Sequence, residues 1–321
     1  MRALVTGGAG YIGSHLVDAL IAADMDVTVL DNLSTGKVGN IQHNLGHPRF
    51  RFVCDTLLNA PLVDRLVAEH DLVYHMAATV GVKYVVDDPL LCIVTNVRGT
   101  ETVLESCYRH WRRVVVASSS EVYGKSEKVP LSEEDDSVLG PTAVGRWSYS
   151  LSKALDEHLA FAYHRQGLPV SVVRFFNSYG PRLDPRGYGS VVARFIGQAL
   201  SGEPITVYDD GRQTRCLTYI TDTVRGTLLT VSLPQAEGKV FNIGSDRETS
   251  MLELAHLVRE LAGAPVDVVH VPYAQAFGPR FEETRRRVPD VRRARQVLGF
   301  EAQVPLEEGL RRTIESFKEQ R

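Results

Sequence analysis

The chain of 321 residues lacks long apolar runs, cysteine motifs and an excess of charge of either sign. It contains no apolar stretch of about 18 residues, and its N-terminus lacks the uninterrupted apolar core of a signal peptide. Its 36 basic and 39 acidic side chains give a formal net charge of −3, which supplies no overall field for nucleic acid or an anionic membrane. We therefore expect a cytoplasmic protein that is neither exported nor membrane-spanning and that binds neither nucleic acid nor membrane.

The sequence is also poor in cysteine. Its four cysteines, Cys54, Cys92, Cys107 and Cys216, show neither CxxC spacing nor the pattern of a disulfide framework. This usage is typical of reduced thiols in a cytosol rather than of disulfides or zinc sites, so we expect structural cysteines and no metal ion. The composition, 44% hydrophobic and 23% charged, is that of a globular chain long enough to bury a large core.

Short apolar runs alternate with helical patterns through the first half of the chain. Strands are expected at residues 3–6, 27–31, 50–55, 72–78, 113–120 and 169–176, and helices at about 11–23, 60–69, 90–109 and 147–166. Such alternation predicts right-handed crossovers and a parallel sheet buried on both faces. The expected fold class is therefore α/β, a Rossmann-type doubly wound parallel sheet with a smaller mixed α/β substrate lobe.

The composition of the sequence changes after Asn177. Residues 178–190 are rich in Gly and Pro, which indicates a loop. The remainder mixes short strands with helices at about 190–201, 221–232, 250–262 and 305–318. We expect a Rossmann domain over residues 1–176, with a return segment near 215–245, and a substrate lobe formed mainly by residues 177–321.

The first expected strand runs directly into a glycine-rich turn. Gly7, Gly10 and Gly13 have the spacing of a dinucleotide fingerprint, in which glycines let backbone N–H groups approach a pyrophosphate at the start of a helix. Tyr11 would begin that helix. Asp31 ends the second expected strand, where a carboxylate would bind the adenosine ribose hydroxyls and repel a 2′-phosphate. The pattern favours NAD over NADP, bound by residues 1–176; the alternative is that Asp31 only opens the DNLSTG turn.

Tyr149 and Lys153 are four residues apart on the helix expected at 147–166, so they face the same way. A neighbouring ammonium would lower the pKa of the tyrosine from about 10 and make it a general base for an alcohol. Taken alone, such a pair is more often two surface neighbours. In this sequence the pair occurs together with the glycine fingerprint and with the hydroxyl cluster of residues 118–120. That cluster lies at the strand end where open α/β sheets bind ligands, so a catalytic pair is favoured.

Seven motifs follow one another in the order seen in extended short-chain dehydrogenase/reductases. They are GGAGYIG (7–13), Asp31, HMAA (75–78), SSSEVYG (118–124), YSLSK (149–153), RFFNSYGPR (174–182) and RRVPD (286–290). Over essentially its whole length the sequence resembles the NAD-dependent nucleotide-sugar epimerases, dehydratases and decarboxylases of this family. The resemblance implies a tightly bound NAD, a nucleotide-diphosphate sugar as substrate, with a UDP-sugar favoured, and oxidation of the sugar C4 hydroxyl as the first step.

The resemblance also assigns roles residue by residue. Tyr149 would take the proton of the C4 hydroxyl, Lys153 would hold the nicotinamide ribose and tune Tyr149, and Ser119 would hydrogen-bond the reacting oxygen. Asp55 would touch the adenine and Asn96 would back the catalytic tyrosine. The cofactor residues implied are Gly7, Gly10, Tyr11, Ile12, Gly13, Asp31, Asn32, Asp55, Ala77, Asn96, Tyr149 and Lys153.

The substrate residues that the resemblance implies are Ser119, Glu121, Tyr149, Asn177, Val191, Arg215 and Arg287. Asn177, Arg215 and Arg287 match positions that hold the nucleotide diphosphate. A diphosphate needs bidentate donors, so one arginine of this kind is expected. Within residues 285–287, however, at least two of the three arginines are expected to be solvated surface charges.

The reaction depends on the two residues after Ser119. Dehydratases of the dTDP-glucose type carry Asp-Glu at this point, whereas this sequence has Ser120-Glu121 and so lacks the acid. Ser-Glu is similar to UDP-glucuronate decarboxylases and equally to GDP-mannose 4,6-dehydratases. The motifs RWSYSLSK (146–153), RQTRC (212–216) and FGPRFEETRRRVPD (277–290) resemble the UDP-glucuronate group.

We therefore expect a UDP-glucuronate decarboxylase with Tyr149, Lys153, Ser119, Ser120 and Glu121 as catalytic residues. A ketone at C4 makes the C6 carboxylate a β-keto acid, which loses CO2 without a strong base. Ser120 and Glu121 would orient that carboxylate and manage the proton returned at C5. The protonation state of Glu121 stays open, because a carboxylate beside a substrate carboxylate is unfavourable unless one is protonated or the geometry separates them. The alternative role for Glu121 is to cap a backbone turn.

Other functions remain in competition. The main alternative is a 4-epimerase acting on UDP-glucose, UDP-galactose or UDP-glucuronate, followed by a 4,6-dehydratase. A non-catalytic dinucleotide sensor is disfavoured, since such proteins typically lose the Tyr-Lys pair. By analogy with relatives, the apolar faces of helices 90–109 and 147–166 predict a homodimer, although they could serve only the core.

Overall fold

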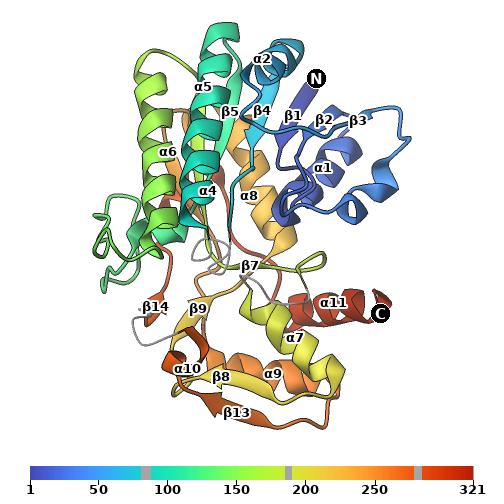
Figure 1. Cartoon of the computed structure of the whole chain (residues 1–321), viewed down its shortest axis with the longest axis vertical. Coiled ribbons are helices and arrows are strands. Elements are labelled where there is room, and N and C mark those ends of the chain that lie inside the picture. Colours follow the sequence, from blue (N-terminus) through green and yellow to red (C-terminus); the bar gives the residue numbers. More distant parts are fainter. Residues whose placement is uncertain (81–87, 185–189, 278–283, 321) are drawn as a thin grey trace.

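The computed structural model describes residues 1–80, 88–184, 190–277 and 284–320. A seven-stranded parallel sheet with the strand order β11-β6-β5-β4-β1-β2-β3 forms its centre (Figure 1). The order reverses between β1 and β4, and such a switch point is where open α/β sheets bind ligands. The strands are β1 (Arg2–Thr6), β2 (Asp26–Leu30), β3 (Phe50–Val53), β4 (Leu72–His75), β5 (Arg113–Ser119), β6 (Val170–Phe175) and β11 (Val240–Ile243). The expected Rossmann-type α/β fold is confirmed.

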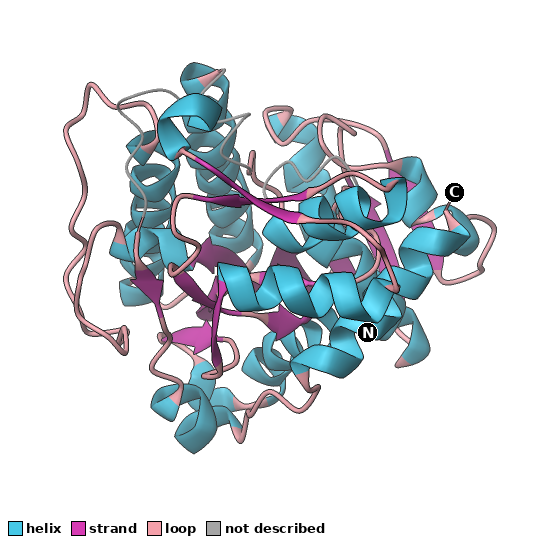
Figure 2. Cartoon of the chain, turned by 90° about the horizontal axis from the view of Figure 1, so that it is seen from below, coloured by secondary structure: helices cyan, strands magenta, loops and turns pink. Residues whose placement is uncertain are grey.

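Helices cover both faces of this sheet, which is why its strands are apolar on both sides. Figure 2, viewed from below, shows the strands enclosed by helices. One face packs against α1 (Tyr11–Ala22) and α8 (Ile220–Ser232). The other packs against α2 (Ala60–Glu69), α5 (Gly99–His110) and α6 (Trp147–Arg165). Successive residues of a strand alternate between the two layers: Val115 packs with the α1 and α8 side, and Val114 and Val116 pack with the α5 and α6 side.

The second half of the chain contributes both to this sheet and to a smaller lobe. Strand β11 pairs with β6 at one sheet edge. The lobe, at the bottom of Figure 1, contains α7 (Val191–Ser201), α9 (Met251–Ala262), α10 (Tyr273–Phe277) and α11 (Leu306–Glu319). Its short strands form three small sheets: β8 (Ile205–Tyr208) with β13 (Val268–Val271), β7 (Ser178–Tyr179) with β10 (Thr218–Tyr219), and β9 (Thr214–Cys216) between β12 (Glu248–Ser250) and β14 (Arg286–Arg287).

The helix expected at 90–109 is interrupted. It begins as α4 (Pro89–Ile93), whose first turn is capped by Asp88, widens into a π-helical turn at Val94–Arg98 and continues as α5. π turns inside α-helices are frequent at functional sites. Here the turn carries Asn96, which is buried beside α6.

The cysteines that the structure describes are all unpaired, and Cys92, Cys107 and Cys216 are buried whereas Cys54 is exposed. Among the described residues no helix is both long and apolar enough to cross a membrane. The same part of the chain contains no group of three or more His, Cys, Asp or Glu side chains arranged to hold a metal ion.

Candidate active site

The glycine-rich turn between β1 and α1 leaves no room for a side chain at Gly7 or Gly13. Gly7 adopts φ +69°, and a Cβ there would lie 2.6 Å from the Ala77 Cα. A Cβ on Gly13 would lie 2.2 Å from the Gly7 carbonyl oxygen. The turn therefore brings bare backbone to the N-terminus of α1, which is the cradle that a pyrophosphate requires.

Asp31 lies just beyond β2 at the edge of this turn. One carboxylate oxygen accepts a hydrogen bond of 3.0 Å from the Ala9 N–H, and the other accepts one of 2.8 Å from the Leu33 N–H. Burial raises its pKa, and the two backbone hydrogen bonds partly offset that effect. Asp31 thus does open the DNLSTG turn, and it also lines the adjoining cleft.

A cleft of about 440 Å³ runs from this turn across the carboxyl ends of the central strands to the lobe. The structure brings most of the site residues predicted from sequence to its walls. These are Gly7, Gly10, Tyr11, Ile12, Gly13, Asp31, Asn32, Asp55, Ala77, Ser119, Ser120, Glu121, Tyr149, Lys153, Asn177 and Arg287. The dinucleotide end and the Tyr-Lys end therefore belong to one continuous cavity.

Three predicted site residues do not line that cleft. Asn96 is 1% exposed and lies behind the wall, where its amide bonds the Ser152 hydroxyl at 3.0 Å and its carbonyl oxygen accepts from the Thr79 N–H at 2.8 Å. Val191 begins α7, and its neighbour Ser190 lines the cleft instead. Arg215 donates to the carbonyl oxygens of Thr214 and Thr284. These three residues lie outside the lining of the cleft, and their binding roles stay predictions.

Tyr149 and Lys153 both reach the cleft from α6, but their electrostatics differ from expectation. Lys153 is 2% exposed, and its ammonium donates at 2.7 Å to Asp156, which is fully buried. Burial raises the pKa of Tyr149; a hydrogen bond with Ser119 lowers it in part, and the charge of Glu121 raises it further. In the chain on its own the pKa of Tyr149 is therefore raised rather than lowered as the spacing predicted, chiefly because the phenol is buried.

Glu121 forms the electrostatic centre of the site. Its carboxylate accepts a hydrogen bond of 2.5 Å from Arg287 and lies 3.8 Å from Arg146. Burial acts to raise the pKa of Glu121, but the charges of Arg287 and Arg146 outweigh it and lower the pKa to about 2. In the chain without substrate, Glu121 is therefore an ion-pair partner, and this pairing favours its ionised form.

The arginine cluster divides as the sequence predicted. Arg285 and Arg286 are exposed and pair with Asp210 and Glu248. Arg287 alone is buried, at 5% exposed, and turns into the cleft. Its strand, β14, lies beside β9, so Arg287 is directly opposite Arg215.

The sequence reasoning missed several residues that line the cleft, including Lys37, Arg182 and Arg146. Arg146 is 9% exposed and flanks Glu121. A signal for it existed, because it precedes Tyr149 by three residues and so lies one helical turn away on the same face. Arg182 stands inside the RFFNSYGPR motif, yet only Asn177 of that motif was singled out.

Comparison with known proteins places the chain in a family. The model of the family "GDP-mannose 4,6 dehydratase" matches residues 4–313. The chain belongs to this family, within the extended short-chain dehydrogenase/reductases. It is 40% identical to the UDP-N-acetyl-alpha-D-glucosaminuronate decarboxylase of Bacillus cytotoxicus, over 99% of this chain and 98% of that protein. It is 38% identical to UDP-glucuronic acid decarboxylase 1 of Xenopus tropicalis, over 99% of this chain and 72% of the relative.

A solved structure of the same family has the same fold. The UDP-glucuronic acid 4-epimerase of Bacillus cereus, in complex with UDP-glucuronic acid and NAD, superimposes with a TM-score of 0.89 at 30% identity, covering 100% of both chains. Membership in this family confirms the expected class, an NAD-dependent enzyme that modifies nucleotide sugars.

Proposed function

We propose that this enzyme is a UDP-glucuronate decarboxylase, which oxidises the sugar at C4 and then releases C6 as CO2. The observation that carries the proposal is the Glu121–Arg287 pair beside Tyr149 in one cleft. An arginine beside the proposed base is suited to a sugar that carries a carboxylate. Two relatives of 38–40% identity, named as decarboxylases of uronate sugars, support the same reaction.

The cleft fits NAD at its glycine-rich end. Gly7, Gly10 and Gly13 leave room for a pyrophosphate at the start of α1, and the Asp31 carboxylate stands where it would meet a ribose. Asn32 and Asp55 line the same end, and Lys153 lines the opposite one. Bound there, NAD would accept the C4 hydrogen as hydride and later return it, and its nicotinamide would bring a positive charge to the region of the phenol.

The remaining chemistry of the first step belongs to side chains of this chain. Tyr149 would take the proton of the C4 hydroxyl, assisted by Ser119, which shares a hydrogen bond with it. Because burial holds the Tyr149 pKa high, the phenol keeps its proton in the protein alone. The base would form only once cofactor and substrate occupy the cleft.

The second step follows from the ketone at C4. The C5–C6 bond would break, CO2 would leave, and the electron pair would pass through C5 to the C4 oxygen as an enolate, which would then take up a proton at C5 from solvent. Tyr149 and Ser119 would donate hydrogen bonds to that oxygen as its negative charge develops. The resemblance implied that Arg287 holds the diphosphate; we assign it instead to orient the departing carboxylate, with the ionised Glu121 holding Arg287 in place.

The test is the mass of the product formed from UDP-glucuronate. A product lighter by one CO2 supports decarboxylation, whereas an isomer of unchanged mass with inverted C4 would establish the 4-epimerase alternative, which the Bacillus cereus neighbour favours. UDP-N-acetylglucosaminuronate belongs in the same panel, because the Bacillus cytotoxicus relative is named for it. If only that sugar is turned over, the proposed reaction stands but the substrate is UDP-N-acetylglucosaminuronate rather than UDP-glucuronate.

We also propose that the enzyme works as a homodimer in the cytoplasm. Five large apolar side chains of the adjacent helices α4 and α6 are 42–70% exposed, namely Leu90, Leu91, Ile93, Leu151 and Leu155. A patch of this kind marks an interaction surface, and a two-fold pairing of the helices would cover it. The unpaired cysteines fit a reducing compartment. Size-exclusion chromatography with light scattering tests the dimer: Leu151→Glu should yield monomers if this face is the interface.

A further inference from the structure

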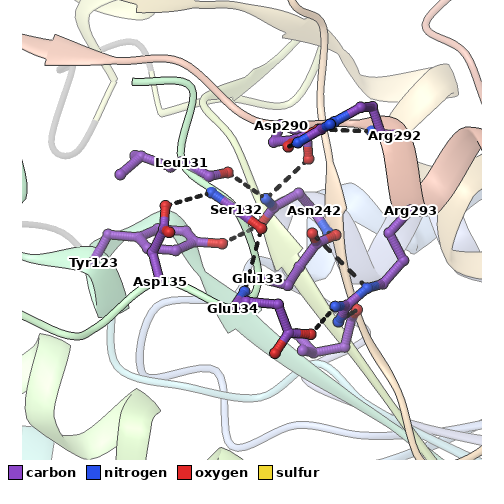
Figure 3. Close-up of polar contacts among 11 residues, drawn as sticks. Tyr123, Leu131, Ser132, Glu133, Glu134, Asp135, Asn242, Asp290, Arg292 and Arg293 are labelled. Atoms are coloured by element: carbon purple, nitrogen blue, oxygen red, sulfur yellow. Dashed lines mark hydrogen bonds and ion pairs between the residues drawn. The ribbon is translucent and has the colours of Figure 1, made fainter. Parts of the chain in front are cut away.

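Asn242 lies outside the cleft, yet its side chain joins the segments that carry Glu121 and Arg287. It sits in β11 and is fully buried. Its carbonyl oxygen accepts a hydrogen bond of 2.7 Å from the Tyr123 hydroxyl. Its amide group donates to the Leu131 carbonyl oxygen at 2.8 Å and to the Asp290 carbonyl oxygen at 3.1 Å. Figure 3 shows these three segments converging on the one amide.

The first of these bonds anchors the Glu121 side of the ion pair. Residues Ser120–Tyr123 form a single 3₁₀ turn at the end of β5, so Tyr123 is two residues from Glu121. The Tyr123 ring is 2% exposed, and the Arg174 guanidinium lies over it, 4.8 Å from the ring centre. The bond from its hydroxyl to Asn242 therefore anchors the turn from which Glu121 extends.

The other two bonds anchor the Arg287 side. The Leu131 N–H donates to the Val288 carbonyl oxygen at 2.8 Å, and the Asp290 N–H donates to the Leu131 carbonyl oxygen at 2.8 Å. Leu131 and residues 288–290 therefore form a short parallel bridge. Arg287 directly precedes this bridge, so the amide of Asn242 fixes the backbone from which Arg287 extends.

We propose that Asn242 is a positioning residue that fixes the relative position of the Glu121 and Arg287 side chains. An amide suits this task because it offers one acceptor and two donors, which match one hydroxyl and two carbonyl oxygens. Aspartate would offer no donor and would face both carbonyl oxygens with a charge, and serine is too short to reach all three partners. The inference deepens the proposed function, since its effect on rate assumes that the Glu121–Arg287 pair serves CO2 loss.

The kinetic test uses Asn242→Ser, with Ser171→Ala as its matched control. Ser171 is a buried serine on the neighbouring strand β6, and its hydroxyl donates to the carbonyl oxygens of Ala236 and Thr230, outside the two segments that Asn242 joins. With UDP-glucuronate, Asn242→Ser should lower kcat about 10- to 100-fold and change KM less than about threefold, because small misplacements of a reacting constellation cost rate rather than affinity. Ser171→Ala should leave kcat unchanged. Equal losses in both variants would overturn the proposal.

A double-mutant cycle separates positioning from general destabilisation. In an Arg287→Gln background, Asn242→Ser should lower kcat less than about twofold further, because the pair it positions is already broken. A full 10- to 100-fold loss in that background would refute the role. Should Asn242→Ser fail to fold, Tyr123→Phe removes only the hydroxyl bond; it should cost about 3- to 10-fold in kcat in the wild-type background and nothing in the Arg287→Gln background.

A crystal structure of Asn242→Ser supplies a readout that needs no substrate. The Glu121 Oε1 to Arg287 Nη1 distance, 2.5 Å in the wild-type chain, should open beyond hydrogen-bond range. An unchanged distance would overturn the positioning role even if the enzyme decarboxylates. Conversely, if wild-type protein releases no CO2 but the distance opens, the proposed function fails and the positioning role stands.

Discussion

Glu121 and Arg287 are 166 positions apart in the sequence, yet their side chains meet at 2.5 Å in the cleft. Glu121 follows β5, the strand that ends in the hydroxyl cluster, and Arg287 lies on β14, a short strand of the lobe. The pair therefore ties the dinucleotide-binding sheet to the lobe at the point where the reacting sugar would lie. Replacing either residue therefore tests both the reaction and the contact between the sheet and the lobe.

Replacing Glu121 by Gln should separate the two chemical steps. Gln keeps the size of the side chain but leaves Arg287 without its counter-charge, so CO2 loss should slow about 10²- to 10⁴-fold, while oxidation at C4 continues. Trapping of the 4-keto uronate by borohydride reduction and mass analysis would show this. The matched control is Ser150→Ala, which removes only a 3.5 Å contact to the same carboxylate. A variant that releases CO2 at the wild-type rate would remove Glu121 from the mechanism.

The same ion pair makes the free energy of unfolding depend on pH in the acid range. The pKa of Glu121 is lowered to about 2 from an ordinary value near 4.5 by the arginines. A lowered pKa stabilises the fold above the ordinary value, and that stability is lost as pH falls from about 4.5 towards 2. The gain is at most about 3 kcal/mol, since one pKa unit corresponds to about 1.4 kcal/mol. Urea unfolding of wild type and Glu121→Gln should therefore differ most at pH 5 to 7 and converge near pH 2.

Removing the phenol hydroxyl should stop the oxidation without emptying the cofactor site. Tyr149→Phe takes away the proposed base but leaves the glycine turn and Asp31 intact, so turnover should fall about 10²-fold or more while NAD binding persists. Steady-state turnover together with cofactor content of the purified protein measures both effects. Substantial residual activity would mean that another group takes the C4 proton.

Gly13→Ala should damage the cofactor end through sterics alone. The new Cβ would lie 2.2 Å from the Gly7 carbonyl oxygen, so the turn must shift. We expect a fall in thermal midpoint and at least a tenfold weaker affinity for NAD, measured by calorimetric titration. Gly39→Ala is a suitable control, because a Cβ there meets nothing within 4 Å. Unchanged NAD affinity in Gly13→Ala would contradict the placement of the pyrophosphate.

Much of the fold was predictable because its strands are buried on both faces and its helices alternate with them. The runs at 3–6, 27–31 and 113–120 correspond closely to β1, β2 and β5. The π turn at Val94–Arg98 was not predictable, since its sequence continues an ordinary helical pattern. The turn packs against α6, a contact that a single sequence does not reveal.

The site shows the same division. Motifs that are local in sequence, such as the glycine turn and the Tyr-Lys pair, were found together with their location. Properties set by distant partners were not. The rise in the Tyr149 pKa was not predicted, because it comes chiefly from burial of the phenol in the folded chain, which spacing along one helix does not reveal. Asn242 gave no signal at all, because its role consists of bonds to residues 119, 111 and 48 positions away.

The central claim is that this cleft removes a carboxylate from a sugar nucleotide after oxidising C4. Mass analysis of the product from UDP-glucuronate labelled with ¹³C at C6 tests it most directly. Decarboxylation predicts labelled CO2 and a UDP-pentose that carries no label. A UDP-sugar that retains the label with inverted C4 would contradict the account and assign the enzyme to the 4-epimerases.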